Sequence, residues 1–325
     1  MSKPRTTSLA GALAALVLLL VLVFVRPVAA ASSPHRAVVQ PRQLVAVPYG
    51  PQPEQVLDVH VPSGVSGPLP IVLFAHPGGW IAGDRTNIPE VISTLVDDLH
   101  VAVVSVDYRL VSDDGNGGSV NAFPTASYDM DRAVRFVRAH AAEWGLDPQR
   151  IIAAGASAGG QLAALAGAAP GTFRDPALPS ELIRVSPVVQ GVIDYVGPSD
   201  FRTFPDAGGW GPPLAAAFLD CGTAGVVACD PAQVAEASVA THLRAGAPPA
   251  YLAYGVQDTL VLAGTQGAPL AREWAAARGE DDRPDETDGV RYEEQPRAGH
   301  NFDLENSDIN GMERWVQQVF AGVLR

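Results

Sequence analysis

Gly155-Ala156-Ser157-Ala158-Gly159-Gly160 follows the short apolar run 150–154 and precedes an Ala- and Leu-rich helical pattern at 161–169. This order predicts a strand, a tight turn and a helix, with Ser157 at the apex in a strained conformation that the nearby glycines permit. The turn lifts the serine hydroxyl clear of the sheet and puts the amide of Ala158 at the positive end of the helix. We therefore expect Ser157 to be a nucleophile, although a chain with 32 glycines can also contain such a turn by chance.

A second glycine-containing motif, His76-Pro77-Gly78-Gly79-Trp80, closes the apolar run 71–75. It therefore lies at the carboxyl end of a predicted strand, the edge where open α/β sheets bind ligands. Glycines leave backbone N–H groups accessible to a developing negative charge, so Gly78 and Gly79 are predicted oxyanion donors together with Ala158. The alternative interpretation is an ordinary turn from a strand into a loop.

Two later strand ends carry the residues that would activate a serine. Asp258 follows the apolar run 250–255, and His300 follows the run 291–295. A serine hydroxyl is a weak nucleophile near neutral pH and needs an imidazole to accept its proton and a carboxylate to stabilise the imidazolium. The chain order Ser157, Asp258, His300 is that of nucleophile, acid and base in α/β-hydrolases.

The acid has a rival in Asp194, which follows the apolar run 189–193. Asp258 is favoured because its strand directly precedes, along the chain, the strand that leads to His300. The alternative role for Asp258 is that of a helix N-cap. The other six histidines lie in the N-terminal segment, in predicted strands or helix ends, before a Pro-rich connection or in the motif that begins at His76.

Several short motifs occur in an order typical of one enzyme family. They are His76-Pro77-Gly78-Gly79-Trp80, Asp107-Tyr108-Arg109-Leu110, Gly155-Ala156-Ser157-Ala158-Gly159-Gly160, Gly197-Pro198-Ser199-Asp200, Gly255-Val256-Gln257-Asp258 and Gly299-His300. On these residues the chain resembles the α/β-hydrolase esterases of the hormone-sensitive-lipase type. It is more similar to the branch that contains feruloyl esterases, acetylxylan esterases and small carboxylesterases.

The resemblance implies a carboxylesterase-type serine hydrolase that works through an acyl-enzyme, with a triad of Ser157, Asp258 and His300 and no cofactor. It specifies the substrate weakly: short-chain, aryl or acetyl esters, either small molecules or linked to polysaccharide. An amidase or arylformamidase, and a binding module without catalysis, are the alternatives. Pro77 departs from the family's first glycine, which concerns the loop's conformation more than its chemistry, because the oxyanion donors correspond to Gly78 and Gly79.

Strand and helix patterns alternate along the chain and predict a mostly parallel eight-stranded sheet with helices on both faces, an α/β-hydrolase fold. The predicted strands are 44–48, 55–61, 70–75, 101–107, 150–154, 189–195, 250–255 and 291–295. The predicted helices are 88–99, 127–144, 158–169, 270–278 and 312–324.

The segment 199–247 interrupts this alternation between the sixth and seventh strands. It contains several aromatic residues and prolines, and such folds insert a lid at this place. The segment is predicted either to roof the acyl pocket or to be a structural connection that touches no substrate. Trp80 leaves a similar choice open, because it would line the pocket next to the oxyanion glycines or belong to the core.

Cys221 and Cys229 are the only cysteines and lie eight positions apart. In an exported protein two such cysteines form a disulfide more readily than they remain free, so a bridge is predicted, with two buried thiols as the alternative. No cluster of cysteine, histidine or carboxylate residues has the spacing of a metal site, and we expect none.

Residues 1–31 have the features of a targeting segment. Lys3 and Arg5 precede a 17-residue apolar run from Leu9 to Val25, and small residues follow at 28–30. This pattern predicts a signal peptide and a secreted or extracytoplasmic protein. The apolar run is at the short limit for a membrane span, so an uncleaved anchor is the alternative.

The spacing of the motifs predicts the domain organisation of residues 32–325, and the net charge limits the kinds of partner. Residues 32–43 are polar and contain prolines, which predicts a short tether. Residues 44–325 are predicted to form one catalytic domain, because its motifs span most of that length. The formal net charge of −13 argues against nucleic acid or polyanionic partners, and we expect membrane contact only through an uncleaved N-terminal segment.

Overall fold

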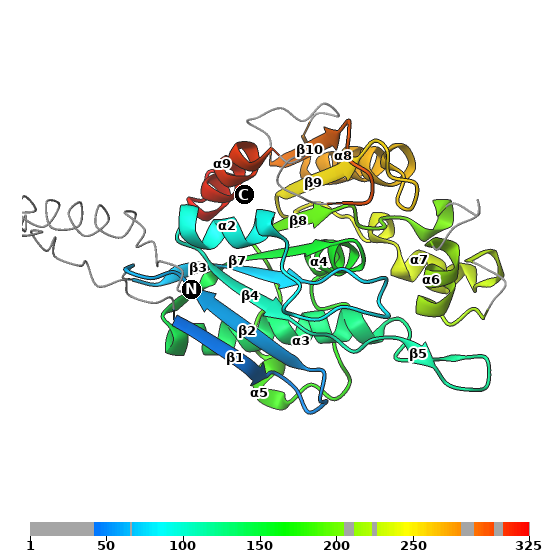
Figure 1. The fold of residues 1–325 in the computed structure, drawn as a ribbon, viewed down its shortest axis with the longest axis horizontal. Helices are drawn as coiled ribbons and strands as arrows, with labels where there is room; N and C mark the ends of the chain where they lie inside the picture. The colour runs from blue at the N-terminus through cyan, green and yellow to red at the C-terminus, as the bar shows by residue number, and fades with distance from the viewer. Residues whose placement is uncertain are drawn as a thin grey trace, which may run out of the picture. The chain divides into compact units, whose positions relative to one another are not determined.

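An eight-stranded sheet is formed by β1 (Arg42–Pro48), β2 (Val56–Val61), β3 (Leu69–Ala75), β4 (Ala102–Val106), β7 (Leu146–Ala156), β8 (Gly191–Tyr195), β9 (Ala250–Gly255) and β10 (Val290–Gln295). Its spatial order is β1-β2-β4-β3-β7-β8-β9-β10 (Figure 1). Strand β2 pairs antiparallel with β1 and with β4, and every later pair is parallel. The predicted mostly parallel sheet is thereby confirmed.

The computed structural model describes residues 42–324 apart from 66, 205–210, 223–225, 281–288 and 302–307. The chain from Gln40 onward is one compact unit. The predicted targeting segment and nearly all of the predicted tether lie outside the described residues and stay predictions. Within the described ranges, the helices are all too short or too polar to cross a membrane.

Helices cover both faces of the sheet, and alternate residues of the strands point to the two layers. In β3, Ile71 and Leu73 join one apolar cluster while Val72 and Phe74 join the other. The first cluster includes side chains of α3 (Thr125–His140), α4 (Ala158–Ala168) and α8 (Ala268–Arg278), and the second includes α2 (Glu90–Asp98) and α9 (Ile309–Phe320). A strand that is buried on both faces is apolar throughout, which is why these strands could be predicted from short apolar runs.

The end of α3 and the start of β7 differ from the predicted boundaries. The predicted helix 127–144 is α3 followed by a 3₁₀ turn at Ala141–Trp144, which Gly145 ends in a left-handed conformation. Strand β7 begins at Leu146, earlier than the predicted residue 150, because the chain enters the sheet directly after that glycine. The pattern missed a small two-stranded sheet of β5 (Ser112–Asp113) and β6 (Ser119–Val120) and the short helix α5 (Ser180–Ile183).

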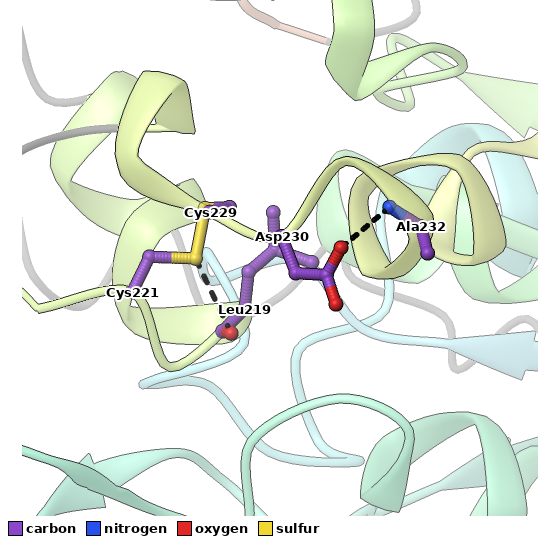
Figure 2. Close-up of a disulfide and its surroundings, with 5 residues drawn as sticks. All are labelled: Leu219, Cys221, Cys229, Asp230 and Ala232. Carbon is purple, nitrogen blue, oxygen red and sulfur yellow. Dashed lines mark hydrogen bonds between the residues drawn. A yellow bond between two sulfur atoms is a disulfide. The ribbon is translucent and has the colours of Figure 1, made fainter.

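The described parts of the segment between β8 and β9 contain short helices, which the strand and helix pattern had left unassigned. They include α6 (Gly211–Phe218) and α7 (Pro231–Ala237). Cys221, after α6, and Cys229, before α7, form the predicted disulfide (Figure 2). Asp230 follows at once and caps α7, since its carboxylate accepts a hydrogen bond of 2.9 Å from the N–H of Ala232 (Figure 2).

Reduction of this disulfide should loosen the segment 199–247 before the sheet unfolds. On the chain-entropy model, closing a loop of this length removes about 2.5 kcal/mol of unfolded-state entropy. Hydrogen exchange followed by mass spectrometry should show that reductant speeds exchange in residues 211–237 more than it speeds exchange in the sheet strands. Two thiols that titrate in the native, non-reduced protein would contradict the bridge.

Candidate active site

Ser157 occupies a sharp turn between β7 and α4. Its φ of 54° and ψ of −120° lie outside the regions that side chains normally favour, so the turn is strained. A Cβ atom on Gly155 would lie 2.0 Å from the carbonyl oxygen of Gly159, which explains why a glycine is needed there. The N–H of Ser157 donates to the carbonyl of Tyr195 on β8 at 2.8 Å, and this bond anchors the turn to the next strand.

His300 and Asp258 lie beside this serine, as their positions in the sequence predict. The ring atom Nε2 of His300 is 2.8 Å from Ser157 Oγ, and Nδ1 is 2.7 Å from Asp258 Oδ2. The other carboxylate oxygen of Asp258 accepts hydrogen bonds from the N–H groups of Leu260 (2.7 Å) and Val261 (2.9 Å). The carboxylate is almost fully buried and held at both oxygens, so the imidazole meets a fixed acceptor.

The loops that carry these two residues are joined backbone to backbone. The N–H of Gln257 donates to the carbonyl of Ala298 at 2.9 Å, and a Cβ atom on Gly255 would lie 2.2 Å from the carbonyl oxygen of Gly299. Since β9 and β10 are parallel neighbours, both loops leave the sheet at the same edge. The close contact holds Asp258 and His300 at a fixed separation.

The motif at His76 lies against the first turn of α4. A Cβ atom on Gly159 would lie 2.1 Å from the carbonyl oxygen of Ala75 and 2.6 Å from that of His76. Gly78 and Gly79 have φ values of +137° and +59°, which only glycine adopts without strain. The first N–H groups of a helix have no partner within the helix, so the amide of Ala158 is available beside this loop.

The side chain of Tyr108, which had no predicted role, holds this loop in place. Tyr108 donates its hydroxyl hydrogen to the carbonyl of His76 at 2.9 Å, and the two rings stack with centroids 4.2 Å apart. Burial lowers the pKa of His76, which favours an uncharged ring in this stack. Tyr108 belongs to the motif at 107–110, which the sequence analysis used only for the family resemblance. That motif was the signal in the sequence that could have identified this tyrosine.

Trp80 belongs to the core in this structure, the second of the two alternatives. Its side chain is 2% exposed and stacks on Phe218 of α6 with ring centroids 4.2 Å apart. Its indole N–H donates to Gln161 on α4 at 3.2 Å, and the amide of Gln161 donates in turn to the carbonyl of Ala237 at 3.1 Å. Trp80 therefore ties the insertion to α4 through packing, which no local pattern around it could indicate.

Asp194, the rival acid, lies behind the serine turn. It is fully buried and accepts a hydrogen bond of 2.9 Å from the N–H of Gly197, while its other oxygen lies 2.8 Å from the hydroxyl of Tyr254. That hydroxyl also donates to the carbonyl of Gly197 at 2.7 Å. A tyrosine hydroxyl has one hydrogen and a carbonyl only accepts, so both contacts are satisfied when Asp194 is protonated and donates to Tyr254. Burial agrees, because it raises the pKa of Asp194 to about 7.

The described residues contain no group of three or more histidine, cysteine, aspartate or glutamate side chains arranged to hold a metal ion. The polar side chains gathered at Ser157 are those of a proton relay: a hydroxyl, an imidazole and a buried carboxylate in one line. Such a line can move the serine proton to the imidazole while the carboxylate stabilises the charge that results.

The sheet order, the strained serine turn and the strand ends that meet beside it define an α/β-hydrolase. Residues 57–272 match the BD-FAE family, a hormone-sensitive-lipase-like family, and the chain belongs to it. The probable carboxylic ester hydrolase LipM of Mycobacterium tuberculosis is 30% identical over 263 residues, which cover 77% of this chain and 54% of LipM. Esterase LipC of the same organism is 28% identical over 278 residues, which cover 83% of this chain and 62% of LipC. The chain thus spans little more than half of these relatives.

Solved structures agree on the fold. A truncated carbohydrate esterase from gut microbiota superimposes with a TM-score of 0.70 at 20% identity, covering 86% of this chain and 96% of that structure. The butyrate-bound esterase 2 of Thermogutta terrifontis superimposes with a TM-score of 0.62 at 22% identity, covering 87% and 95%. At such identities the likeness supports the architecture and leaves the activity to the residues of this chain.

A protonated Asp194 makes the folded state less stable as pH rises. An ion-paired carboxylate has the opposite effect, because it stabilises the fold as pH rises. Its folded pKa is about 7, above the ordinary value near 3.8, so between these values the folded state binds more protons than the unfolded state. The free energy of unfolding should therefore fall as pH rises from about 4 to about 7, by on the order of 3 kcal/mol from this group. Denaturant unfolding of Asp194→Asn beside the wild type should lack this component. An unchanged pH dependence in the variant would show that Asp194 is ionised in the fold.

Proposed function

We propose that this chain is a serine carboxylic-ester hydrolase that works through an acyl-enzyme. The observation that carries the proposal is the continuous contact from Ser157 Oγ to His300 Nε2 and from His300 Nδ1 to Asp258 Oδ2, at 2.8 and 2.7 Å. Family membership and relatives named as esterases or ester hydrolases support the same reaction class.

In the proposed reaction, Ser157 Oγ attacks the ester carbonyl carbon while His300 Nε2 takes the hydroxyl proton. The tetrahedral intermediate collapses, the bond to the alcohol oxygen breaks, and His300 returns the proton to that oxygen. A water molecule then attacks the acyl-serine with His300 again as base, which releases the acid and restores the serine. Asp258 keeps Nδ1 protonated and stabilises the imidazolium in both halves of the cycle.

The amides of Gly78, Gly79 and Ala158 are proposed to hold the oxyanion. The close approach of Gly159, in the first turn of α4, to the carbonyls of Ala75 and His76, which directly precede Pro77 and the two glycines, supports this assignment. Fixed N–H donors at the position of a developing charge need no reorganisation during the reaction. Loss of one such donor typically costs about 10²–10³ in kcat.

The substrate is proposed to be a short-chain, aryl or acetyl ester, free or attached to a polysaccharide. The name of one similar solved structure, a butyrate-bound esterase, favours a short acyl group, and that of another, a carbohydrate esterase, fits attachment to a polysaccharide. Export of the protein is proposed from the targeting pattern of residues 1–31, and the disulfide is consistent with an oxidising compartment. If the leader stays uncleaved, the same domain would be held at a membrane by that segment.

Replacement of the nucleophile tests the proposal most directly. Ser157→Ala should fold like the wild type, because it removes only one hydroxyl, and should lower kcat/KM on p-nitrophenyl acetate by about three or more orders of magnitude. Ser93→Ala, at an exposed serine of α2, is the matched control and should keep full activity. A serine-directed phosphonate should label the wild type stoichiometrically and leave Ser157→Ala unlabelled. Near wild-type turnover by pure Ser157→Ala would refute the proposal.

The acid can be tested by a pair of isosteric changes. Asp258→Asn removes the charge that stabilises the imidazolium and offers His300 the wrong tautomer, so kcat/KM should fall by about 10³–10⁴. Asp194→Asn is the control and should lower kcat/KM by less than about tenfold at neutral pH, since an amide can replace a protonated carboxyl. The opposite ranking of the two variants would assign the acid to β8. In the wild type, kcat/KM should decline on acidification, because an imidazolium cannot accept the serine proton.

A further inference from the structure

Helix α6 of the insertion brings one apolar side chain onto the loop of the proposed oxyanion donors. A Cβ atom on Gly79 would lie 2.9 Å from Leu214 Cδ1 and 3.2 Å from Cδ2, so the leucine side chain lies directly on the Cα of Gly79. Leu214 is half-buried, whereas its neighbours Ala215 and Ala216 on the same helix are fully buried. The leucine thus stands at the edge of the packed interior, beside the position proposed for the substrate carbonyl.

The first turn of α6 also touches the loop that carries the proposed acid. A Cβ atom on Gly211 would lie 3.2 Å from Leu260 Cδ1, and Leu260 is two residues after Asp258. Gly211 and Leu214 are three residues apart, about 4.5 Å along a helix. One turn of α6 therefore contacts both the acid loop, at Leu260, and the loop of the proposed oxyanion donors, at Gly79.

The C-terminal end of α6 makes further contacts with the body of the protein. Phe218, one turn after Leu214, stacks on Trp80, and its carbonyl accepts a hydrogen bond of 2.7 Å from the N–H of Phe123. The disulfide between Cys221 and Cys229 closes the chain just beyond the helix. Helix α6, which carries Leu214, is therefore packed against the body of the protein at its C-terminal end, and the disulfide restrains the segment that follows it.

The proposed chemistry assigns a direction to each group of the substrate. The carbonyl oxygen points to the amides of the oxyanion loop, and the alcohol oxygen points to His300, which must return a proton to it. The acyl group takes the remaining direction, away from His300 and next to the loop that Leu214 covers. We propose that Leu214 is a specificity-determining residue that closes the acyl site and restricts the enzyme to short acyl groups. This inference rests on the proposed function and adds the feature that sets its acyl range.

The experiment compares p-nitrophenyl acetate, butyrate and octanoate, which share one leaving group. Leu214→Ala should raise the kcat/KM ratio of octanoate to acetate by at least about tenfold, since apolar pocket contacts of this size discriminate by about 10–200-fold. Leu214→Trp should lower the ratio of butyrate to acetate by a similar factor, and Leu214→Ile should stay close to the wild type. Val227→Ala, at a valine of the same insertion that is 74% exposed, is the matched control and should leave every ratio unchanged.

A second series varies the alcohol with the acetyl group held constant, from methyl to p-nitrophenyl acetate. Its ratios should stay within about twofold in the Leu214 variants, and a larger change there than in the acyl series would place Leu214 on the alcohol side and overturn the inference. Acyl ratios that do not move in Leu214→Ala or Leu214→Trp, with acetate turnover retained, would also overturn it while the proposed function stands. A wild type that hydrolyses no ester and resists phosphonate labelling would instead refute the proposed function, and the inference with it.

Discussion

The backbones of β3 and α4 touch at Ala75 and Gly159, and the arrangement of the site depends on this contact. Any side chain at Gly159 would place its first carbon 2.1 Å from the carbonyl oxygen of Ala75, so the helix can approach only with a glycine there. The approach brings the first turn of α4 beside the His76 loop and fixes where Ser157 stands relative to it. A wider separation would move Ser157 away from the His76 loop.

The strained backbone of Ser157 costs free energy that the surrounding packing must offset. A residue other than glycine with positive φ costs on the order of 1–3 kcal/mol, and the fold must overdetermine it. Ser157 is held from three sides: by its N–H bond to Tyr195, by the apolar helix α4 that follows, and by the sheet strand that precedes. Helix α4 contains leucines and small residues that are nearly all buried, so its burial far outweighs the local strain. Behind the serine turn, the hydroxyl of Tyr254 on β9 contacts both Asp194 on β8 and the carbonyl of Gly197, which links the two neighbouring strands.

Much of this architecture can be predicted from the sequence because its elements are buried on both faces. A continuous apolar run such as residues 71–75 is enough to predict a central strand. The serine turn can be predicted because close backbone contacts require glycine at positions 155 and 159. The orientation of Trp80 could not be predicted, because it depends on Phe218, which is distant in sequence and comes from an irregular insertion. The raised pKa of Asp194 escapes a sequence pattern for the same reason, since it follows from burial by segments that are distant in sequence.

The two cysteines have a consequence for how the chain matures. A chain with one pair of thiols has a single possible intramolecular linkage, so oxidation cannot generate scrambled isomers that must be rearranged. Because Cys221 and Cys229 are separated by only eight positions within one insertion, their encounter needs no long-range pairing of strands. The sheet can therefore assemble without waiting for an oxidant, and the covalent link can form before or after the strands pair. The order of these two events is free, and either order leads to the same product.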